Sequence, residues 1–333
     1  MTDKVRWGLL STASINQALI PAIRQSKRGE LAAVASRSLD NAKTYAKKWE
    51  IPNAFGSYQE MLDSGKVDAV YIGLPNHLHA PWSIKSLQAG VHVLCEKPFT
   101  TSLDEADAMI ATSKETGCVL AEAFMYRHHP QTKIVGDFLK SGRLGEISAV
   151  RGIFNFAMSD ERRQAPDVRL VPDWGGGALW DVGVYPLSYS QFIMGGPPEW
   201  VFGSQWIGPH GVDETFCGQM GYPGGRIAQI NCGFRSPFHT HVEIIGSEGR
   251  LEITRPFVSL DSDRHLTFYD ASGKPEEIPV PEKYLYLGEV EDMHAAILDG
   301  QKQYLSLQET RNHIKTVLAL YESAKTGKAV HLK

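Results

Sequence analysis

A lysine that directly follows an apolar run is the first residue of this sequence with the makings of chemistry. Residues 91–95 are apolar and predict a buried strand of a parallel sheet, which ends at Glu96, Lys97 and Pro98. In open α/β sheets, ligands bind beyond the carboxyl ends of the strands, so Lys97 is directed at a ligand site. A lysine at the mouth of an apolar site can act as an acid or base near neutral pH. The alternative is an exposed lysine that caps a strand.

Asp181 and Tyr185 form a second candidate set, preceded by the glycines at 175–177. Their i, i+4 spacing places both side chains on one face of a helix. The glycines permit a sharp turn with backbone close to a ligand. A phenol with a pKa of about 10 can pass a proton beside a lysine while a cofactor takes a hydride. A buried tyrosine with a satisfied hydroxyl is the alternative, and the presence of Lys97 in the same chain favours chemistry.

The first third of the chain alternates strand-like and helix-like segments with short connections. The predicted strands are 5–10, 31–36, 69–74, 91–95 and 119–124, and the predicted helices are 15–25, 39–49, 82–88 and 103–116, with a short one from 58 to 62. This alternation predicts a parallel sheet covered by helices on both faces, with right-handed crossovers.

The pattern changes after residue 124. A helix at 131–141 precedes β-like segments at 147–157, 200–207, 215–222, 226–234, 241–245, 250–254 and 265–269, and helices at 289–298 and 307–326 follow. The glycine-containing segments 223–225 (Pro-Gly-Gly) and 246–249 (Gly-Ser-Glu-Gly) are typical of β-hairpin turns and favour antiparallel pairing. The fold prediction is α/β: a doubly wound parallel sheet of Rossmann type in a nucleotide-binding domain, 1–124, and a large, open, mostly antiparallel sheet in an α+β domain, 125–333. The second domain is expected to bind substrate and to mediate oligomerisation.

The first strand and helix should hold a dinucleotide, but their loop has no glycine in the usual positions. The G-x-G-x-x-G/A register falls on Ser11, Ala13 and Asn16. Small residues still allow backbone to approach a pyrophosphate, and a helix N-terminus favours an anion. The hydroxyls of Ser11, Thr12 and Ser14 are candidate donors to phosphate, or plain helix-capping groups.

The end of the second strand predicts the cofactor. NAD-binding folds place an acidic residue there, whereas this chain has Ser36, Arg37 and Ser38. An arginine flanked by two hydroxyls can clamp a 2′-phosphate. The alternative is a solvated loop arginine. The missing acid favours NADP over NAD.

Composition excludes several classes of partner. The chain has 333 residues, 42% hydrophobic and 22% charged, which predicts two soluble domains, and its formal net charge of −4 gives no basic field for nucleic acid. No apolar run approaches the roughly 18 residues of a membrane span, and strand-like sequence starts too early for a signal peptide. The four cysteines have no C-x-x-C spacing, so we expect free thiols and a cytoplasmic protein. The histidine pairs at 77/79, 128/129 and 239/241 lack the carboxylate or cysteine partners of a zinc site, so we expect no metal site.

Together these residues resemble the glucose–fructose oxidoreductase/inositol dehydrogenase (Gfo/Idh/MocA) family over nearly the whole chain. Cys95-Glu96-Lys97-Pro98 is similar to the family's E-K-P motif, with a catalytic lysine and a Lys–Pro bond that is commonly cis. Residues 73–79, Gly-Leu-Pro-Asn-His-Leu-His, resemble the family's turn along the nicotinamide ribose. Residues 175–185 resemble its G-G-G-x-x-x-D-x-G-x-[HY] motif, with a substrate-binding aspartate and a catalytic His or Tyr. The loop at Ser11 departs from the family's glycines.

The resemblance implies a role for each matched residue. It gives catalytic roles to Lys97, Tyr185 and Asp181, and substrate contacts to the same three. By their places in the sequence, after the last strand of the first domain and before the glycine run, Arg127 and Trp174 are candidates to line the substrate pocket, or to serve in the core or at a hinge. The cofactor contacts are expected from three loops and the lysine motif: Ser11, Thr12, Ala13, Ser14, Ile15, Ser36, Arg37, Ser38, Leu74, Pro75, Asn76, His77, His79, Glu96 and Lys97. Within the family, a tyrosine at 185 and an arginine at 37 most resemble the NADP-linked branch. That branch contains dihydrodiol dehydrogenases, xylose dehydrogenases and sugar ketoreductases.

The expected activity is NADP-dependent hydride transfer at a carbinol or carbonyl carbon of a sugar or a related cyclic polyol. One alternative is a glycosidase of the same fold that oxidises its sugar transiently, and another is a non-catalytic NADP sensor. The substrate and the carbon oxidised stay open, because selectivity lies in loops such as 159–172, whose position the sequence does not give. The open sheet face must be covered, which predicts a homodimer or homotetramer.

Overall fold

The structure is a computed structural model that describes residues 4–164, 167–258 and 263–332. The chain folds into two compact units. The first contains Met1–His128 and Tyr284–Arg311, and the second contains His129–Lys283 and Asn312–Lys333. Both differ from the predicted division after residue 124, because the chain returns to the first unit near its end.

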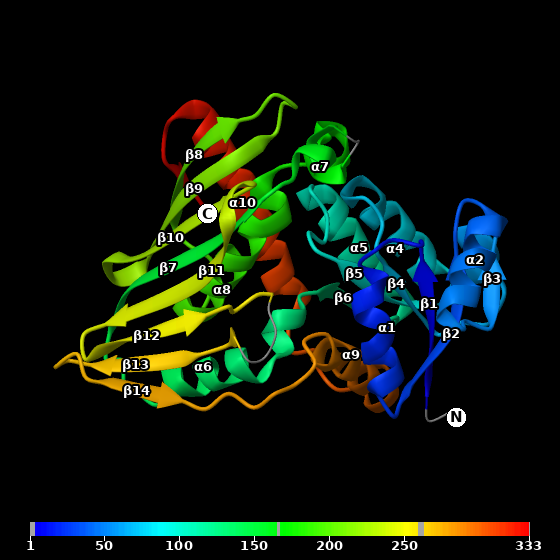
Figure 1. Cartoon of the computed structure of the whole chain (residues 1–333), viewed down its shortest axis with the longest axis horizontal. Helices are drawn as coiled ribbons and strands as arrows, with labels where there is room; N and C mark the ends of the chain where they lie inside the picture. Colours follow the sequence, from blue (N-terminus) through cyan, green and yellow to red (C-terminus); the bar gives the residue numbers. More distant parts are fainter. Residues whose placement is uncertain (1–3, 165–166, 259–262, 333) are drawn as a thin grey trace. The chain divides into compact units, whose positions relative to one another are not determined.

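The first unit is built on a parallel sheet with six strands among the described residues (Figure 1). The order β3-β2-β1-β4-β5-β6 comprises Asn53–Phe55, Gly29–Ala35, Val5–Leu10, Ala69–Ile72, His92–Glu96 and Leu120–Ala123. Every neighbouring pair is parallel. The helices are α1 (Asn16–Gln25), α2 (Leu39–Trp49), α3 (Tyr58–Asp63), α4 (His79–Gln88), α5 (Leu103–Thr116) and α9 (Leu287–Asp299). The strand order reverses between β1 and β4, the switch point at which α/β sheets bind ligands.

Helix α9 belongs to the first unit because its buried face completes that unit's core. Val290 and Met293 are buried in the same cluster as Trp7. The indole Nε1 of Trp7 donates to Nε2 of His294 over 2.8 Å, and the hydroxyl of Tyr284 donates to the carbonyl of Ala18 over 2.6 Å. Nothing local in the sequence of α9 specifies this distant partner.

The second unit contains a sheet with nine strands in the described part of the chain, and its order is β14-β13-β12-β11-β7-β10-β9-β8-β15. The strands are Pro275–Ile278, Leu266–Asp270, Gly249–Thr254, Arg235–Gly246, Ile147–Ala157, Arg226–Gly233, Asp213–Tyr222, Trp200–Ile207 and Val330–His331. Strand β7 is antiparallel to β11 but parallel to β10, and the other pairs are antiparallel. The predicted fold class is therefore confirmed, with one parallel pair at the centre of the sheet.

Helices pack on one face of this sheet (Figure 1). They are α6 (Pro130–Lys140), α8 (Val184–Met194) and the second-unit part of α10 (Leu307–Thr326). Side chains alternate along β7: Val150 and Phe154 are buried, while Arg151 is exposed. A Cβ at Gly152 would lie 2.7 Å from Cβ of Pro186, so glycine lets α8 pack closely on β7.

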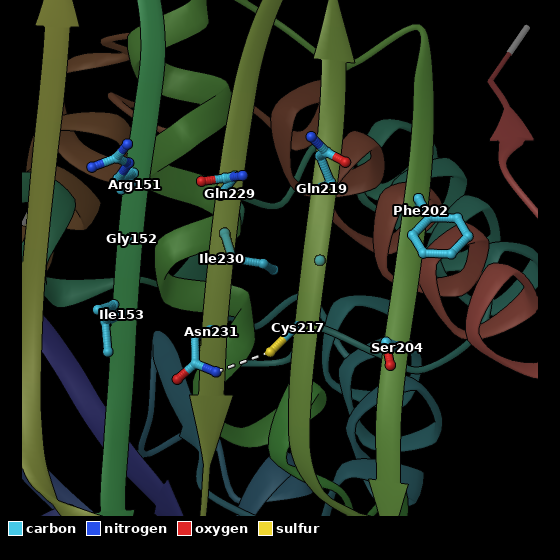
Figure 2. A pocket seen from close by; sticks show the side chains of 11 residues that line it. Arg151, Gly152, Ile153, Phe202, Ser204, Cys217, Gln219, Gln229, Ile230 and Asn231 are labelled. Carbon is cyan, nitrogen blue, oxygen red and sulfur yellow. Dashed lines mark hydrogen bonds between the residues drawn. The ribbon is translucent and has the colours of Figure 1, made fainter. Parts of the chain in front are cut away.

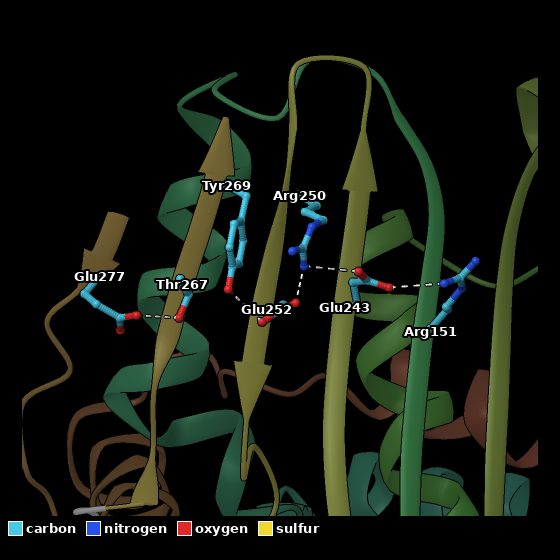
Figure 3. A network of polar contacts seen from close by, with 7 residues as sticks. All are labelled: Arg151, Glu243, Arg250, Glu252, Thr267, Tyr269 and Glu277. Atoms are coloured by element: carbon cyan, nitrogen blue, oxygen red, sulfur yellow. Dashed lines mark hydrogen bonds and ion pairs between the residues drawn. The ribbon is translucent and has the colours of Figure 1, made fainter. Parts of the chain in front are cut away.

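The opposite face of the sheet has two regions. Figure 2 shows a shallow pocket over β7, β10, β9 and β8, lined by Phe202, Ser204, Cys217, Gln219, Gln229 and Asn231 among others. Figure 3 shows a polar network over β7 and β11–β14, in which Glu243 lies 3.4 Å from both Arg151 and Arg250. This face is thus mixed in character and differs from the apolar, helix-covered face.

No described helix has the length and apolar character needed to cross a membrane. The four cysteines are free thiols. Among the residues whose placement is described, no group of three or more His, Cys, Asp or Glu side chains could hold a metal ion.

Candidate active site

Lys97 follows β5 directly, and its peptide bond to Pro98 is cis. The backbone N–H of Lys97 donates to Oε2 of Glu96 over 3.1 Å, and the hydroxyl of Tyr71 donates to Oε1 of the same carboxyl. Glu96 is buried, and burial raises its pKa although the charge of Lys97 opposes this. The end of β5 is therefore held by a buried carboxyl group bonded on both oxygens.

His79 links the end of β4 to the Lys97 turn. Its Nδ1 lies 2.8 Å from the carbonyl oxygen of Pro98, and its Nε2 lies 2.8 Å from that of Leu74. Burial lowers the pKa of His79, although the two carbonyls oppose this shift. Leu74 and His79 are buried, and Pro75, Asn76 and His77 are half-buried between them. The structure thus places this predicted cofactor loop directly beside the lysine.

The loop after β1 replaces the expected glycines by side-chain hydrogen bonds. Ser11 has φ +125°, a backbone conformation that favours glycine. Its hydroxyl donates to the carbonyl of Gly73 over 3.1 Å and accepts from the N–H of Ala13 over 3.2 Å. The amide of Asn16, which is fully buried, donates to the carbonyl of Ser11 over 2.8 Å. The Ser11 hydroxyl therefore serves the loop itself.

The remaining residues of this loop lie at the start of α1 and are more accessible. Ser14 is exposed, and Thr12, Ala13 and Ile15 are half-buried. In the described part of the chain the Thr12 and Ser14 hydroxyls have no hydrogen-bond partner. Hydroxyls and N–H groups at a helix N-terminus suit a phosphate group, so these residues fit a pyrophosphate.

At the end of β2, Ser36 is buried, Arg37 is exposed and Ser38 caps α2. The Ser38 hydroxyl accepts from the N–H of Asn41 over 3.4 Å. No described carboxylate forms an ion pair with Arg37. An accessible guanidinium at a helix N-terminus fits a 2′-phosphate.

In the second unit, Asp181 lies on a π-helical turn, η5 (Leu179–Gly183), immediately before α8. Its Oδ2 accepts from Nε of Arg169 over 2.7 Å. Arg169 also donates to Asp167 from its backbone N–H over 3.0 Å and from Nη1 over 3.3 Å. The charges of Asp181 and Asp167 raise the pKa of Arg169, although burial opposes them. Single-turn π-helices are frequent at functional sites.

Tyr185 lies in the first turn of α8 and is buried among aromatic rings. Its ring centroid is 5.3 Å from that of Phe154 and 5.5 Å from that of Phe257. These contacts limit the rotation of the ring, so the direction of its hydroxyl is set by packing. Lys97 belongs to the first unit and Tyr185 to the second.

The glycines before Asp181 are required by close backbone packing. A Cβ at Gly176 would lie 2.7 Å from the carbonyl oxygen of Arg169 and 2.8 Å from that of Val171. Gly177 has φ +126° and donates from its N–H to the carbonyl of Arg169 over 2.9 Å. The glycine run therefore folds the loop at 169–177 onto itself, beside the carboxylate of Asp181.

The two further candidates differ in surroundings. Arg127, in η2 (Met125–His128), is 2% exposed, and its Nη2 donates to Glu309 over 3.1 Å within the first unit. Trp174, at the end of η4 (Pro172–Trp174), is half-buried in the second unit. These surroundings favour a core role for Arg127.

Sequence reasoning missed Arg169 and the carboxylate Asp213, whose Oδ2 accepts from the N–H of Leu179 over 2.8 Å. Arg169 lies in a segment without periodicity, and the sequence around Asp213 does not show that this acid is buried. Only their partners in space distinguish them, so no local signal was available.

Family comparisons agree with this geometry. Residues 5–124 match the model described as "Oxidoreductase family, NAD-binding Rossmann fold", and residues 132–252 match "GFO/IDH/MocA C-terminal domain". A D-xylose 1-dehydrogenase (NADP(+)) of Haloferax volcanii is 36% identical over 98% of this chain and 99% of its own. A trans-1,2-dihydrobenzene-1,2-diol dehydrogenase of Bos taurus is 31% identical over 83% of this chain and 80% of its own.

Solved structures give the same result. KijD10, a 3-ketoreductase from Actinomadura kijaniata in complex with NADP and TDP-benzene, superposes with a TM-score of 0.89 at 29% identity, over 96% of this chain and 98% of its own. An aldose-aldose oxidoreductase from Caulobacter crescentus shares the fold, with a TM-score of 0.89 at 24% identity over 99% of this chain and 100% of its own. This chain belongs to the GFO/IDH/MocA oxidoreductase family.

Proposed function

We propose that this protein is an NADP-dependent oxidoreductase that acts on a CH–OH or keto group of a sugar or a related cyclic polyol. The observation that carries the proposal is the position of Lys97 at the carboxyl end of β5, where its backbone N–H donates to the buried carboxyl of Glu96. Beside it lie the loops that suit a dinucleotide. Two relatives support the same class, a D-xylose 1-dehydrogenase (NADP(+)) and a trans-1,2-dihydrobenzene-1,2-diol dehydrogenase.

The loops at the ends of β1, β2, β4 and β5 are proposed to bind the cofactor. The N–H groups and hydroxyls of Thr12 and Ser14 would hold the pyrophosphate, and Arg37 with its neighbouring serines would hold the 2′-phosphate. Leu74, Pro75, Asn76 and His77 would line the nicotinamide ribose. When bound, NADP(H) accepts or supplies the hydride.

The protein's own residues would manage the proton and the substrate. In the oxidative direction, Lys97 or Tyr185 accepts the proton from the reacting hydroxyl, and in the reductive direction the same group returns it. Asp181 would accept a hydrogen bond from a second hydroxyl of the substrate, next to the reacting one. Its Oδ2 meanwhile accepts from Nε of Arg169. Trp174 would contact the sugar ring.

Two other functions are compatible with the fold. A glycosidase with transient oxidation would keep its cofactor between turnovers, and an NADP sensor would bind it without turnover. The presence of Lys97, Asp181 and Tyr185 together favours an oxidoreductase over a sensor.

Incubating the protein with NADP⁺ and a panel of aldoses, anhydrosugars, inositols and cyclic diols, while following absorbance of the reduced cofactor, tests the proposal. We expect turnover on at least one member of the panel. Cofactor binding with no turnover in either direction would contradict it and support the sensor.

We also propose that the protein forms a homodimer or homotetramer in which the face of the nine-stranded sheet opposite its helices meets a second copy. Phe202 and Trp206 of β8 lie on the same side of the strand and are 40% and 43% exposed. The pocket over β7–β10 lies on the same face (Figure 2). Exposed apolar side chains on a broad sheet face are typical of interaction surfaces. A monomer by light scattering at micromolar concentration would contradict this.

A cytoplasmic location is proposed on the free thiols. Cys95, Cys118 and Cys232 are buried and Cys217 is exposed. Reduced cysteines suit a reducing compartment.

A further inference from the structure

Asp213 is a buried carboxylate that binds the turn before the Asp181–Tyr185 helix. It opens β9 and is 2% exposed. Its Oδ2 accepts from the backbone N–H of Leu179 over 2.8 Å, and its Oδ1 accepts from the hydroxyl of Tyr321 over 2.7 Å. Leu179 is the first residue of η5, two positions before Asp181. The carboxylate of Asp213 thus links β9, α10 and the first residue of η5, the turn that leads into α8.

The glycine run is shaped around the same carboxylate. A Cβ built at Gly177 would lie 2.2 Å from Oδ1 of Asp213 and 2.8 Å from the hydroxyl of Tyr321. The φ of +126° at Gly177 also disfavours other residues. The N–H of Asp181 then donates to the carbonyl of Gly177 over 3.0 Å. Asp213 therefore contacts the backbone at Leu179, between Gly177 and Asp181.

The neighbouring residue, Glu214, holds a different segment. Its Oε2 accepts from Nη1 of Arg163 in α7 (Asp160–Gln164), and Nη2 of Arg163 donates to the carbonyl of Phe234 over 3.1 Å. Successive side chains of a strand point to opposite sides. Asp213 and Glu214 are thus adjacent buried acids with separate partners, which provides a matched comparison.

We propose that Asp213 is a positioning residue that, as a carboxylate, holds the turn at 177–179 and thereby sets where Asp181 and Tyr185 present their side chains. This inference rests on the proposed function, since it gives those two residues a role in the reaction. Asp213 itself does not contact the reacting atoms in this scheme. Its effect passes through the N–H of Leu179.

Loss of the charge at Asp213 should release the turn at low pH. Burial raises the pKa of Asp213 to about 6, although the donors from Tyr321 and Leu179 favour the ionised form. Above that pH the carboxylate accepts from both donors; below it, the added proton removes an acceptor site. Other titratable groups that face Asp213 are the Tyr321 hydroxyl of α10 and the Cys232 thiol of β10. The charge of Asp181 also raises the pKa of the Cys232 thiol. Neither thiol nor phenol titrates near pH 6, because burial raises the pKa of each.

The test compares Asp213→Asn with Glu214→Gln and Tyr321→Phe in the full-length protein. For Asp213→Asn we expect kcat on a verified polyol to fall roughly 10- to 100-fold, the effect of one hydrogen bond to a charged group. The affinity for NADP should not change. Tyr321→Phe, which removes one donor and keeps the acceptor for Leu179, should lose less. Wild-type kcat should fall as pH drops below about 6, and Asp213→Asn should lack this limb.

Amide hydrogen exchange supplies a readout that does not depend on turnover. Exchange at residues 178–182 should be faster in Asp213→Asn than in wild type, and unchanged at these residues in Glu214→Gln. Equal exchange in all three proteins, or a low-pH limb that persists in Asp213→Asn, would overturn the role of Asp213. If the wild type turns over no polyol, the proposed function fails, and the exchange comparison alone decides whether Asp213 holds the turn.

Discussion

The guanidinium of Arg169 donates from Nε to Oδ2 of Asp181 over 2.7 Å. The side chain that we propose to bind the substrate therefore already has a cationic partner within the protein. About one third of the Arg169 side chain and one sixth of that of Asp181 is accessible, at 33% and 16%. The pair is therefore partly screened by solvent. Its importance lies in the orientation of Asp181, whose other carboxylate oxygen is thereby set in direction.

Replacing Arg169 by Met should raise KM for the polyol substrate more than it lowers kcat. A hydrogen bond to a charged group contributes about 1.5 kcal/mol at the lower end of its range, which corresponds to roughly a ten-fold rise in KM. Arg169→Lys should recover only part of this, because an ammonium cannot contact Asp181 and Asp167 in a fixed fork. Steady-state kinetics would show the change, with Arg162→Met as the control from the same segment. Equal KM in Arg169→Met and Arg162→Met would contradict the role.

Lys97→Met and Tyr185→Phe each remove a proton-transfer group with little change in volume. General acid–base groups contribute roughly 10²- to 10⁴-fold, so kcat should fall on that scale while NADP binding persists. Turnover of a verified substrate and cofactor titration by fluorescence measure the two properties separately. If both variants keep a wild-type kcat, the proposed chemistry is wrong.

Arg37 should determine the choice of cofactor. A charge-assisted hydrogen bond contributes about 1.5–3 kcal/mol, so the wild type should prefer NADP(H) to NAD(H) by roughly ten- to a hundred-fold. Arg37→Asp should lose most of this preference, because an acid repels the 2′-phosphate and accepts from a 2′-hydroxyl. Ser36 and Ser38 should leave some residual NADP binding. Equal affinities for both cofactors in the wild type, by fluorescence titration, would refute this role.

Ser11 offers a test of the loop that lacks glycines. With φ +125° it holds a backbone conformation that costs a non-glycine residue about 1–3 kcal/mol, and its hydroxyl makes two hydrogen bonds. Ser11→Ala keeps the strain and loses the hydroxyl, whereas Ser11→Gly loses the hydroxyl but relieves the strain. The free energy of unfolding should be higher for Ser11→Gly than for Ser11→Ala by about 1–2 kcal/mol. Urea denaturation of the two variants would measure this difference, and an alanine variant as stable as the glycine variant would contradict it.

His294 should make stability depend on pH. Burial, with the charge of Arg28, lowers its pKa from the usual 6.5 to about 4, and the ring accepts from Trp7 as the neutral form. The unfolded chain therefore binds the proton more readily, and stability that is fully present above pH 6.5 falls as pH decreases toward 4. The expected loss between pH 7.5 and pH 5 is about 2 kcal/mol.

The corresponding measurement is urea denaturation at several pH values for wild type and His294→Phe. The phenylalanine variant should be less stable at pH 7.5, because Trp7 and Ser26 lose their partner. It should also lose less stability on acidification than the wild type. Identical pH dependence in the two proteins would show that His294 does not carry the effect.

Much of the local structure was predictable from the sequence. The bounds of β1, α2, α5, β7, β8 and α10 agree with the predicted segments, because each has an apolar pattern whose period matches its structure. Strands β3, β14 and β15 were not predicted, since they are short and their residues are mostly half-buried or exposed. Strand β11 starts at Arg235 instead of 241, because its first residues are exposed on the sheet and show no alternation.

The sequence by itself determined the family, the fold class and the position of Lys97 at the end of a strand, because these depend on residues close together in the chain. Only the tertiary structure decided which distant residues meet: α9 with the first unit, Arg169 with Asp181, and Asp213 with the turn at Leu179. It also decided that Ser11 can replace a glycine, since the amide of Asn16 and the carbonyl of Gly73 hold it. Such contacts are set by packing across the fold, and side chains far apart in sequence carry no local pattern that records them.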